Sequence, residues 1–280
     1  MTNRTPSISV IISTYNAVEW LKKTLWGYAV QTTTDFELVI ADDGSGPETR
    51  QCITAFSKDF PVPIIHVWQE DDGFQKSRIL NKAVEVCNAD YILMSDGDCI
   101  AKSDFVEQHL KHREPNHFLS GGYFKLPLDI SKKITQEDVE KQRCFDINWL
   151  KELGLMPSFK NNKLTAKGLK ATILNQVTPT NASWNGHNAS GWKKDILAVN
   201  GFDERMQYGG QDRELGERLI NMGFKSKQIR YSALCVHLDH PRGYKTAETL
   251  EKNAAIRKNT RKKGYAYTYY GIKKGDSLER

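Results

Sequence analysis

Apolar runs and helical patterns alternate along the first hundred residues. Four short runs rich in Ile, Val and Leu end in polar residues, and this pattern is typical of buried strands. The predicted strands are 8–13, 36–45, 62–69 and 90–96. Between them, apolar residues recur at helical spacing. The predicted helices are 17–31, 48–60 and 73–87. This alternation favours an α/β fold with a parallel sheet and helices on its faces.

The pattern changes at about Pro127. Residues 134–154 predict a helix, whereas 157–176 are basic and irregular. We interpret 127–176 as a variable insertion that covers one side of a ligand crevice. Residues 1–240 then form one domain, and 241–280 form a basic C-terminal extension.

The helical pattern returns before the end of the predicted domain. Leu215, Leu219 and Met222 are spaced for one helix face, and Gly223 follows where a C′ glycine belongs. A strand within 227–240 closes the domain.

Composition narrows the class of protein. The 280 residues suffice for one large α/β domain, and the net charge of +6 is compatible with an anionic ligand. The five cysteines form no CxxC pair, which favours free thiols over a zinc site. Without a signal-peptide pattern or an apolar run long enough to span a bilayer, we expect a cytoplasmic protein.

The strand ends carry the candidate chemistry. Ligands of parallel α/β sheets bind beyond the carboxyl ends of the strands, and three of the four ends here are acidic. Asp96 and Asp98 are two residues apart, so in an extended chain they point to the same side. Their oxygens suit Mg²⁺ or Mn²⁺. An Asp-Gly turn whose side chains cap backbone amides is the structural alternative.

Several short motifs occur together in a fixed order. They are ISVIISTYN, FELVIADDGS, EDDGFQKSRILNKAV, YILMSDGDC, GGQDRE and VHLDH. This order resembles the nucleotide-sugar glycosyltransferases of family 2, in the bacterial branch of galactosyltransferase- and chondroitin-synthase-type catalytic domains. The resemblance covers 7–125 and 178–240. It implies a GT-A fold, with a mixed, mostly parallel sheet flanked by helices.

The resemblance also implies an activity. A sugar is moved, with inversion, from a UDP-sugar to a hydroxyl of a glycan or lipid-linked acceptor. The pathway it suggests is bacterial surface polysaccharide or lipooligosaccharide synthesis.

By the same resemblance, several residues would bind the donor. Thr14, Tyr15 and Asn16 match the loop that holds the base and ribose. Asp43 matches the carboxylate that accepts from the uracil imide, and Asp96 lies near the ribose and metal. Arg78 would lie near the diphosphate, although a solvated helix arginine is the alternative.

The resemblance also assigns residues to the metal and to the acceptor hydroxyl. Asp98 matches the direct metal ligand, and His237 matches a distal ligand, with His240 less favoured. An imidazole ligand favours Mn²⁺ over Mg²⁺. Asp212 matches the general base, although an N-cap aspartate is the commoner reason for Asp at a helix start. Gln211 stands where relatives usually have Glu, which bears on acceptor binding.

The segment WNGHNASGW resembles the lining of the donor-sugar and acceptor side. Asn188 would contact donor-sugar hydroxyls. Trp184 and Trp192 would stack on a sugar face, and each is also a plausible core aromatic.

Other functions remain open at this stage. A sugar nucleotidyltransferase would also hold Mg²⁺ and a nucleotide, but STYNAVEW lacks the Gly- and Lys/Arg-rich first loop of many such enzymes. A glycoside hydrolase would use two carboxylates, and a non-catalytic nucleotide- or carbohydrate-binding domain would need no such set of acids. No motif supports a nucleic-acid partner.

The segment from Lys245 to Lys274 is rich in lysine and arginine and contains several tyrosines. It suits contact with an anionic membrane surface that carries a lipid-linked acceptor. A loop beginning at His240 that folds over the diphosphate is one alternative, and a solvated basic helix is another.

Overall fold

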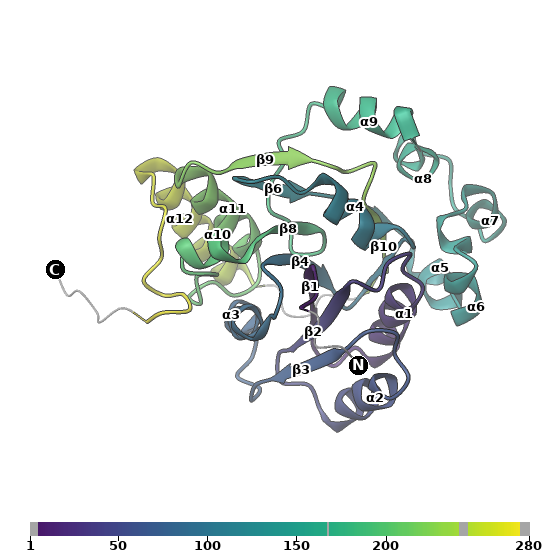
Figure 1. Cartoon of the computed structure of the whole chain (residues 1–280), viewed down its shortest axis with the longest axis horizontal. Coiled ribbons are helices and arrows are strands. Elements are labelled where there is room, and N and C mark those ends of the chain that lie inside the picture. Colours follow the sequence, from purple (N-terminus) through teal and green to yellow (C-terminus); the bar gives the residue numbers. More distant parts are fainter. Residues whose placement is uncertain (1–4, 167, 241–245, 275–280) are drawn as a thin grey trace.

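The computed structural model describes residues 5–166, 168–240 and 246–274, and a seven-stranded sheet forms the centre of this part of the chain (Figure 1). The strands lie in the order β3 (Ile64–Trp68), β2 (Phe36–Asp42), β1 (Ile8–Thr14), β4 (Tyr91–Asp96), β8 (Ala189–Trp192), β6 (His117–Ser120) and β9 (Lys225–Gln228). β8 runs antiparallel to both of its neighbours, and the other pairs are parallel. The expectation of a mixed, mostly parallel sheet in an α/β fold is confirmed.

The alternation of side chains along β1 explains why helices cover both faces. Val10 and Ile12 join a core that includes residues of α1 (Val18–Ala29) and α2 (Pro47–Ser57). Ile11 joins the opposite core, with residues of α3 (Lys76–Val86) and α11 (Gln211–Asn221). This second layer holds the N-termini of α3 and α11 beside the strand ends. The remaining sheet-flanking helices are α4 (Phe105–His112) and α10 (Lys193–Ala198).

A second, three-stranded sheet extends the site side of the fold. Its order is β5 (Cys99–Ala101), β10 (Leu234–His237) and β7 (Gly122–Lys125). Its apolar residues share a third core with the segment that follows β7. The elements of that segment are α5 (Leu128–Lys133), α6 (Gln136–Glu140), η1 (Arg143–Phe145), α7 (Ile147–Glu152), η2 (Phe159–Asn161), α8 (Asn162–Thr165) and α9 (Gly168–Val177).

The structure corrects three expectations about helices. The single helix predicted at 134–154 is broken into α6, η1 and α7, because Gln142 adopts a left-handed conformation (φ 56°) and Asp146 caps a new helix. The stretch predicted to be irregular contains α9. Met222 directly follows α11 as its C-cap and is 42% exposed, so it is not part of the buried face that contains Leu215 and Leu219.

The C-terminal part of the described chain packs against the main body. α12 (Ala247–Lys263) lies on α11, and Asn253 donates to the carbonyls of Gln207, Tyr208 and Gly209. The expected loop over the diphosphate falls largely on 241–245, outside the described residues. No helix in the described ranges is both long and apolar enough to cross a bilayer. All five cysteines are free and buried.

Candidate active site

A cavity of about 1050 Å³ opens at the carboxyl ends of β1 and β4. The starts of α3 and α11 and two strands of the smaller sheet, β7 and β10, also line it. Nine of the residues singled out from the sequence line it: Thr14, Tyr15, Asn16, Asp43, Asp96, Asp98, Gln211, Asp212 and His237. Segments more than two hundred residues apart therefore supply one site.

Lys76 occupies the centre of the acidic groups. It comes from the first position of α3, and its Nζ lies 2.6 Å from Oδ1 of Asp96. Ser13 on the neighbouring strand donates to the same oxygen at 2.8 Å. The parallel register that places Ser13 beside Asp96 thus also fixes the carboxylate.

The ion pair decides the charge state of both groups. Burial alone raises the pKa of Asp96, but the Lys76 ammonium outweighs it and holds that pKa well below the ordinary value. Burial opposes the charge on Lys76, yet Asp96, Asp212 and Asp98 together raise the pKa of the ammonium. The cavity therefore holds a fixed cation among several carboxylates.

Asp212 lies at the second position of α11, where the helix dipole favours a negative charge. Burial raises its pKa, whereas the nearby Lys76 lowers it. Its Oδ1 is buried and accepts a hydrogen bond from no described residue. A Cβ atom on Gly186 would lie 2.7 Å from that oxygen, so only glycine leaves the carboxylate its place. A carboxylate at a cavity with one buried oxygen left without a donor is suited to taking a proton.

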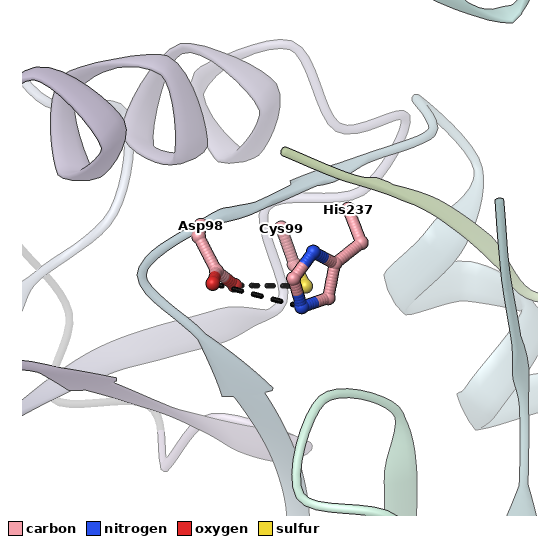
Figure 2. Close-up of side chains that lie close together, drawn as sticks. All are labelled: Asp98, Cys99 and His237. Atoms are coloured by element: carbon pink, nitrogen blue, oxygen red, sulfur yellow. Dashed lines mark hydrogen bonds and ion pairs between the residues drawn. The ribbon is translucent and has the colours of Figure 1, made fainter. Parts of the chain in front are cut away.

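A second cluster lies where β4 leads into β5 (Figure 2). The Oδ2 atom of Asp98 is 3.6 Å from Nε2 of His237 and 2.9 Å from Nε2 of His240. The Cys99 thiol donates to the other oxygen of Asp98 at 3.4 Å. Burial raises the pKa of Cys99 far above its ordinary value, so the sulfur stays protonated and orients the carboxylate.

The donors of this cluster fit a divalent cation. Nδ1 of His237 lies 2.9 Å from the carbonyl of Leu238, which can only accept, so Nδ1 carries the proton. The Nε2 atom is then directed toward the Asp98 carboxylate. A divalent cation between the two groups would be held by this nitrogen and by the carboxylate oxygen. This is the ring orientation found in metal-binding histidines.

The other end of the cavity is lined by the loop after β1 and the end of β2. Asp43 accepts from Gln69 Nε2 at 2.7 Å and from the backbone N–H of Gln75 at 2.9 Å. Burial is the main reason why the pKa of Asp43 is raised to about 6. The Tyr15 hydroxyl donates to Asp71 at 2.9 Å, and the Asn16 N–H donates to Ser45.

The structure does not bring four of the singled-out residues to the cavity. Arg78 is directed to Asp72 at the surface. Asn188 is fully buried, and its amide is bonded to Gly122, Ala233 and His109. The tryptophans Trp184 and Trp192 contact core residues: Trp184 packs on Phe118, and Trp192 packs on Tyr91.

Sequence reasoning missed Lys76 and His187, and both line the cavity. Burial lowers the pKa of His187 to about 4, so the ring is neutral, and its Nε2 is bonded to no described residue. His187 lies in the turn before β8, and its ring packs on Tyr123, which also lines the cavity. No sequence signal distinguished His187 from its neighbour Asn188, or Lys76 from the other helix lysines.

Comparison with known proteins finds similarity to glycosyltransferases. The model of the family described as glycosyl transferase family 2 matches residues 9–142. The chain is 26% identical to the uncharacterized glycosyltransferase YfnE of Bacillus subtilis, over 88% of this chain and 68% of the relative. It is 29% identical to validoxylamine A glucosyltransferase of Streptomyces hygroscopicus, over 82% of this chain and 55% of the relative.

Chondroitin synthase of Escherichia coli is 26% identical, over 93% of this chain and 39% of the relative. The chain thus spans about two thirds or less of the length of these three relatives.

Solved structures share the fold. A mannosyltransferase of Pyrobaculum calidifontis in complex with GDP-Man and Mn²⁺ superposes with a TM-score of 0.58 at 17% identity, covering 86% of this chain and 59% of that chain. TarS of S. aureus, residues 1–349, in complex with UDP-GlcNAc also has a TM-score of 0.58, at 14% identity, covering 89% of this chain and 64% of that chain.

Proposed function

Because the chain contains a glycosyltransferase domain of family 2 with the GT-A fold, we propose that it transfers a sugar, with inversion, from a UDP-sugar to a hydroxyl of a glycan or lipid-linked acceptor. The observation that carries this proposal is the convergence of Asp43, Asp96, Asp98 and Asp212 on one cavity. These four acids come from three segments of the chain: the end of β2, the end of β4 and the start of α11.

The proposed reaction is a single displacement. Asp212 removes the proton from the acceptor hydroxyl, and that oxygen attacks the anomeric carbon of the donor. The nucleoside diphosphate leaves from the opposite face with the electron pair of the broken bond. A positioned base of this kind accelerates a reaction about 10²- to 10⁴-fold. Lys76 supports the role because its charge opposes protonation of Asp212.

The nucleotide would occupy the end of the cavity lined by Thr14, Tyr15, Asn16 and Asp43. The buried Asp43 carboxylate suits the imide N–H of uracil, which adenine and cytosine lack. Asp96 would then lie toward the ribose and the diphosphate. The donors that already bind Asp43, from Gln69 and Gln75, hold it ready for a further donor.

Asp98 and His237 would hold a divalent cation, with His240 as a third group on the same carboxylate oxygen. Mixed carboxylate and imidazole donors favour Mn²⁺, with Mg²⁺ as the alternative. Such an ion would offset the negative charge that grows on the leaving diphosphate. The cation in the fold neighbour from Pyrobaculum supports this assignment.

The acceptor would enter beside Gln211 and Asp212. The Gln211 side chain accepts from the N–H of Gly209 at 2.9 Å, which a glutamate would do equally well. Its amide group presents donors that a glutamate lacks. Replacement of the usual acid by Gln211 therefore favours an acceptor with hydrogen-bond acceptors at this point.

The basic C-terminal segment would contact a membrane on the cytoplasmic side. The last turn of α12 carries Arg261, Lys262 and Lys263, and Tyr265, Tyr267 and Tyr269 follow in exposed positions. This combination suits anionic headgroups and a headgroup-level aromatic. A surface role in polysaccharide or lipooligosaccharide synthesis would use such a contact.

The proposal is tested by nucleotide binding and then by turnover. In a thermal-shift titration with Mn²⁺, UDP should raise the Tm, and omission of the metal should reduce the shift. A larger shift with nucleoside triphosphates would favour a nucleotidyltransferase instead. A screen of UDP-sugars for metal-dependent hydrolysis or transfer then identifies the donor. Retention of anomeric configuration in the product would overturn the single displacement.

A further inference from the structure

The segment after α7 carries the four most exposed large apolar side chains of the described residues. Met156, Phe159, Leu169, Ile173 and Val177 are 75%, 86%, 76%, 47% and 63% exposed, respectively. We call these five residues the apolar rim. Figure 1 shows α8 and α9 at the periphery of the molecule, away from the central sheet.

The two sides of α9 differ in what they contact. Ala171 is buried, and the Asn175 side chain donates to Ser232 and accepts from the N–H of Tyr231. Leu169, Ile173 and Val177 follow at intervals of four residues and therefore share another side of the helix. The contacts of Asn175 hold the helix so that this stripe faces solvent.

Charge distinguishes what would cover the stripe. The sequence has no Asp or Glu between Glu152 and Asp195, but it has four lysines between positions 160 and 170. The exposed Lys170 follows Leu169 directly, and Lys160 follows Phe159. Apolar side chains in a segment with lysines and no acids complement a bilayer with anionic headgroups, into which the apolar groups insert while the ammonium groups stay at the surface.

The rim is also connected to the cavity. Nζ of Lys163 in α8 donates to the carbonyl of Tyr123 at 2.9 Å and lies over its ring. Tyr123 lines the cavity and packs on His187. A membrane at the rim would therefore lie on the side of the cavity that Tyr123 and His187 line.

We propose that the apolar rim and its lysines seat the protein on an anionic lipid surface, which presents a lipid-linked acceptor to the cavity. The first part is independent of any activity. The second part rests on the proposed function, since it names the class of acceptor. This seat is distinct from the C-terminal segment: Figure 1 places α9 and α12 at separate ends of the view.

Flotation with lipid vesicles tests the seat. The full chain should bind mixed phosphatidylcholine–phosphatidylglycerol vesicles and bind phosphatidylcholine alone weakly. Replacing Leu169, Ile173 and Val177 together by serine should reduce binding roughly tenfold or more. The matched control is Leu197→Ser with Ile220→Ser, two exposed apolar residues elsewhere, and it should bind as the wild type does. Circular dichroism and Tm establish that each variant is folded.

Charge variants test the lysines of the rim. Lys160→Glu with Lys170→Glu should reduce the preference for anionic vesicles, whereas Lys58→Glu with Lys82→Glu, at exposed positions outside the rim and the C-terminal segment, should leave it unchanged. The proposal is overturned if the rim variants bind vesicles as the wild type does, or if the wild type does not bind. Rim-dependent self-association in sedimentation velocity, without vesicle binding, would instead identify the rim as a contact between two copies.

Activity assays keep the two proposals separable. Hydrolysis of the UDP-sugar by water needs no membrane, so the rim variants should hydrolyse the donor at the wild-type rate. Vesicle binding without any donor turnover would leave the seat standing and contradict the proposed function. Wild-type transfer to a lipid-linked acceptor by the triple serine variant would overturn the link between the seat and the acceptor.

Discussion

Lys76 and Asp96 form an ion pair of 2.6 Å between the start of α3 and the end of β4, in the middle of the cavity. The lysine also opposes protonation of Asp212, whose pKa is raised by burial. One cation thus acts on two carboxylates that come from segments more than a hundred residues apart. The charge state of the proposed base depends on a helix residue that does not touch it through a hydrogen bond.

Replacing Lys76 by methionine removes that cation while retaining much of its length. The pKa of Asp212 should then rise further, since burial acts on it without an opposing charge. A base must be deprotonated, so the acidic limb of the kcat/KM profile should move to higher pH, by roughly one pH unit or more. Activity lost at low pH should return as the pH is raised.

The exposed Lys82 lies on the same helix and offers a control. Lys82→Met should leave the pH profile unchanged. If Lys76→Met lowers activity equally at every pH, then the lysine acts on binding alone and not on the charge of Asp212.

Two variants test Asp212 as the base, and both should reduce kcat. Asp212→Asn should reduce kcat about 10²- to 10⁴-fold, because the amide cannot take the proton. Gly186→Ala leaves the carboxylate chemically intact but places a methyl group on its position, 2.7 Å from Oδ1. It should reduce kcat by about tenfold or more through displacement of the base. Near-normal turnover by folded Asp212→Asn would exclude this residue as the base.

Much of the fold and part of the site could be predicted because strand ends are marked in the sequence. β1, β2 and β4 are apolar runs that end at Thr14, Asp42 and Asp96, and the parallel register brings those ends together. The cavity residues at strand ends therefore followed from periodicity and the topology of α/β sheets. The alternative interpretation of Asp212 as an N-cap is wrong, because Gly210 is the N-cap and Asp212 is the second residue of α11.

The remaining site residues depend on side-chain direction, which periodicity does not give. Asn188 and His187 are neighbours, yet one lies in the core and the other at the cavity. Lys76 and Arg78 lie two positions apart in α3, a rotation of about 200°, so one points into the cavity and the other to the surface. The break at Gln142 likewise results from a left-handed residue that no apolar spacing records.

Nucleotide affinity should depend on pH through Asp43. Its pKa is raised to about 6, so the carboxylate is ionised at pH 8 and largely protonated at pH 5. Protonation adds an O–H where Gln69, Gln75 and the uracil imide all donate. Affinity should therefore fall as the pH decreases through about 6, by roughly tenfold for each unit below it.

The measurement is calorimetry with a UDP-sugar, since its diesterified diphosphate does not titrate in this range as UDP does. Asp43→Asn should bind more weakly at pH 8 and show a flat profile. A pH step of unchanged size in that variant would assign the titration to another group.

Metal binding should depend on Asp98 and the two histidines to different extents. Asp98→Asn should weaken Mn²⁺ binding most, because both rings face its Oδ2. His237→Ala should cost about 10- to 100-fold in affinity, as loss of a ligand or of its orientation usually does. Electron paramagnetic resonance of free Mn²⁺ measures this without any turnover. An affinity unchanged in both variants would place the cation elsewhere, and His240→Ala shows whether the second ring contributes.

The helix that carries Asp212 is held by a buried ion pair, which predicts a stability effect. Arg218 pairs with Glu214 one turn earlier in α11 and donates to the carbonyls of Val199 and Gly201. Arg218→Met leaves the Glu214 carboxylate buried without its partner, which costs about 3–5 kcal/mol. For a chain of this size the Tm should fall by about 10 °C.

The exposed Arg213 on the same helix is the matched control, and Arg213→Met should change the Tm by no more than about 1–2 °C. The double variant Glu214→Met with Arg218→Met should regain part of the loss, because it buries no unpaired charge. A double variant as unstable as Arg218→Met would mean that the two backbone hydrogen bonds, and not the charge pair, fix the helix. At temperatures well below the Tm of each variant, the single and the double variant should both keep their activity, since neither Glu214 nor Arg218 lines the cavity.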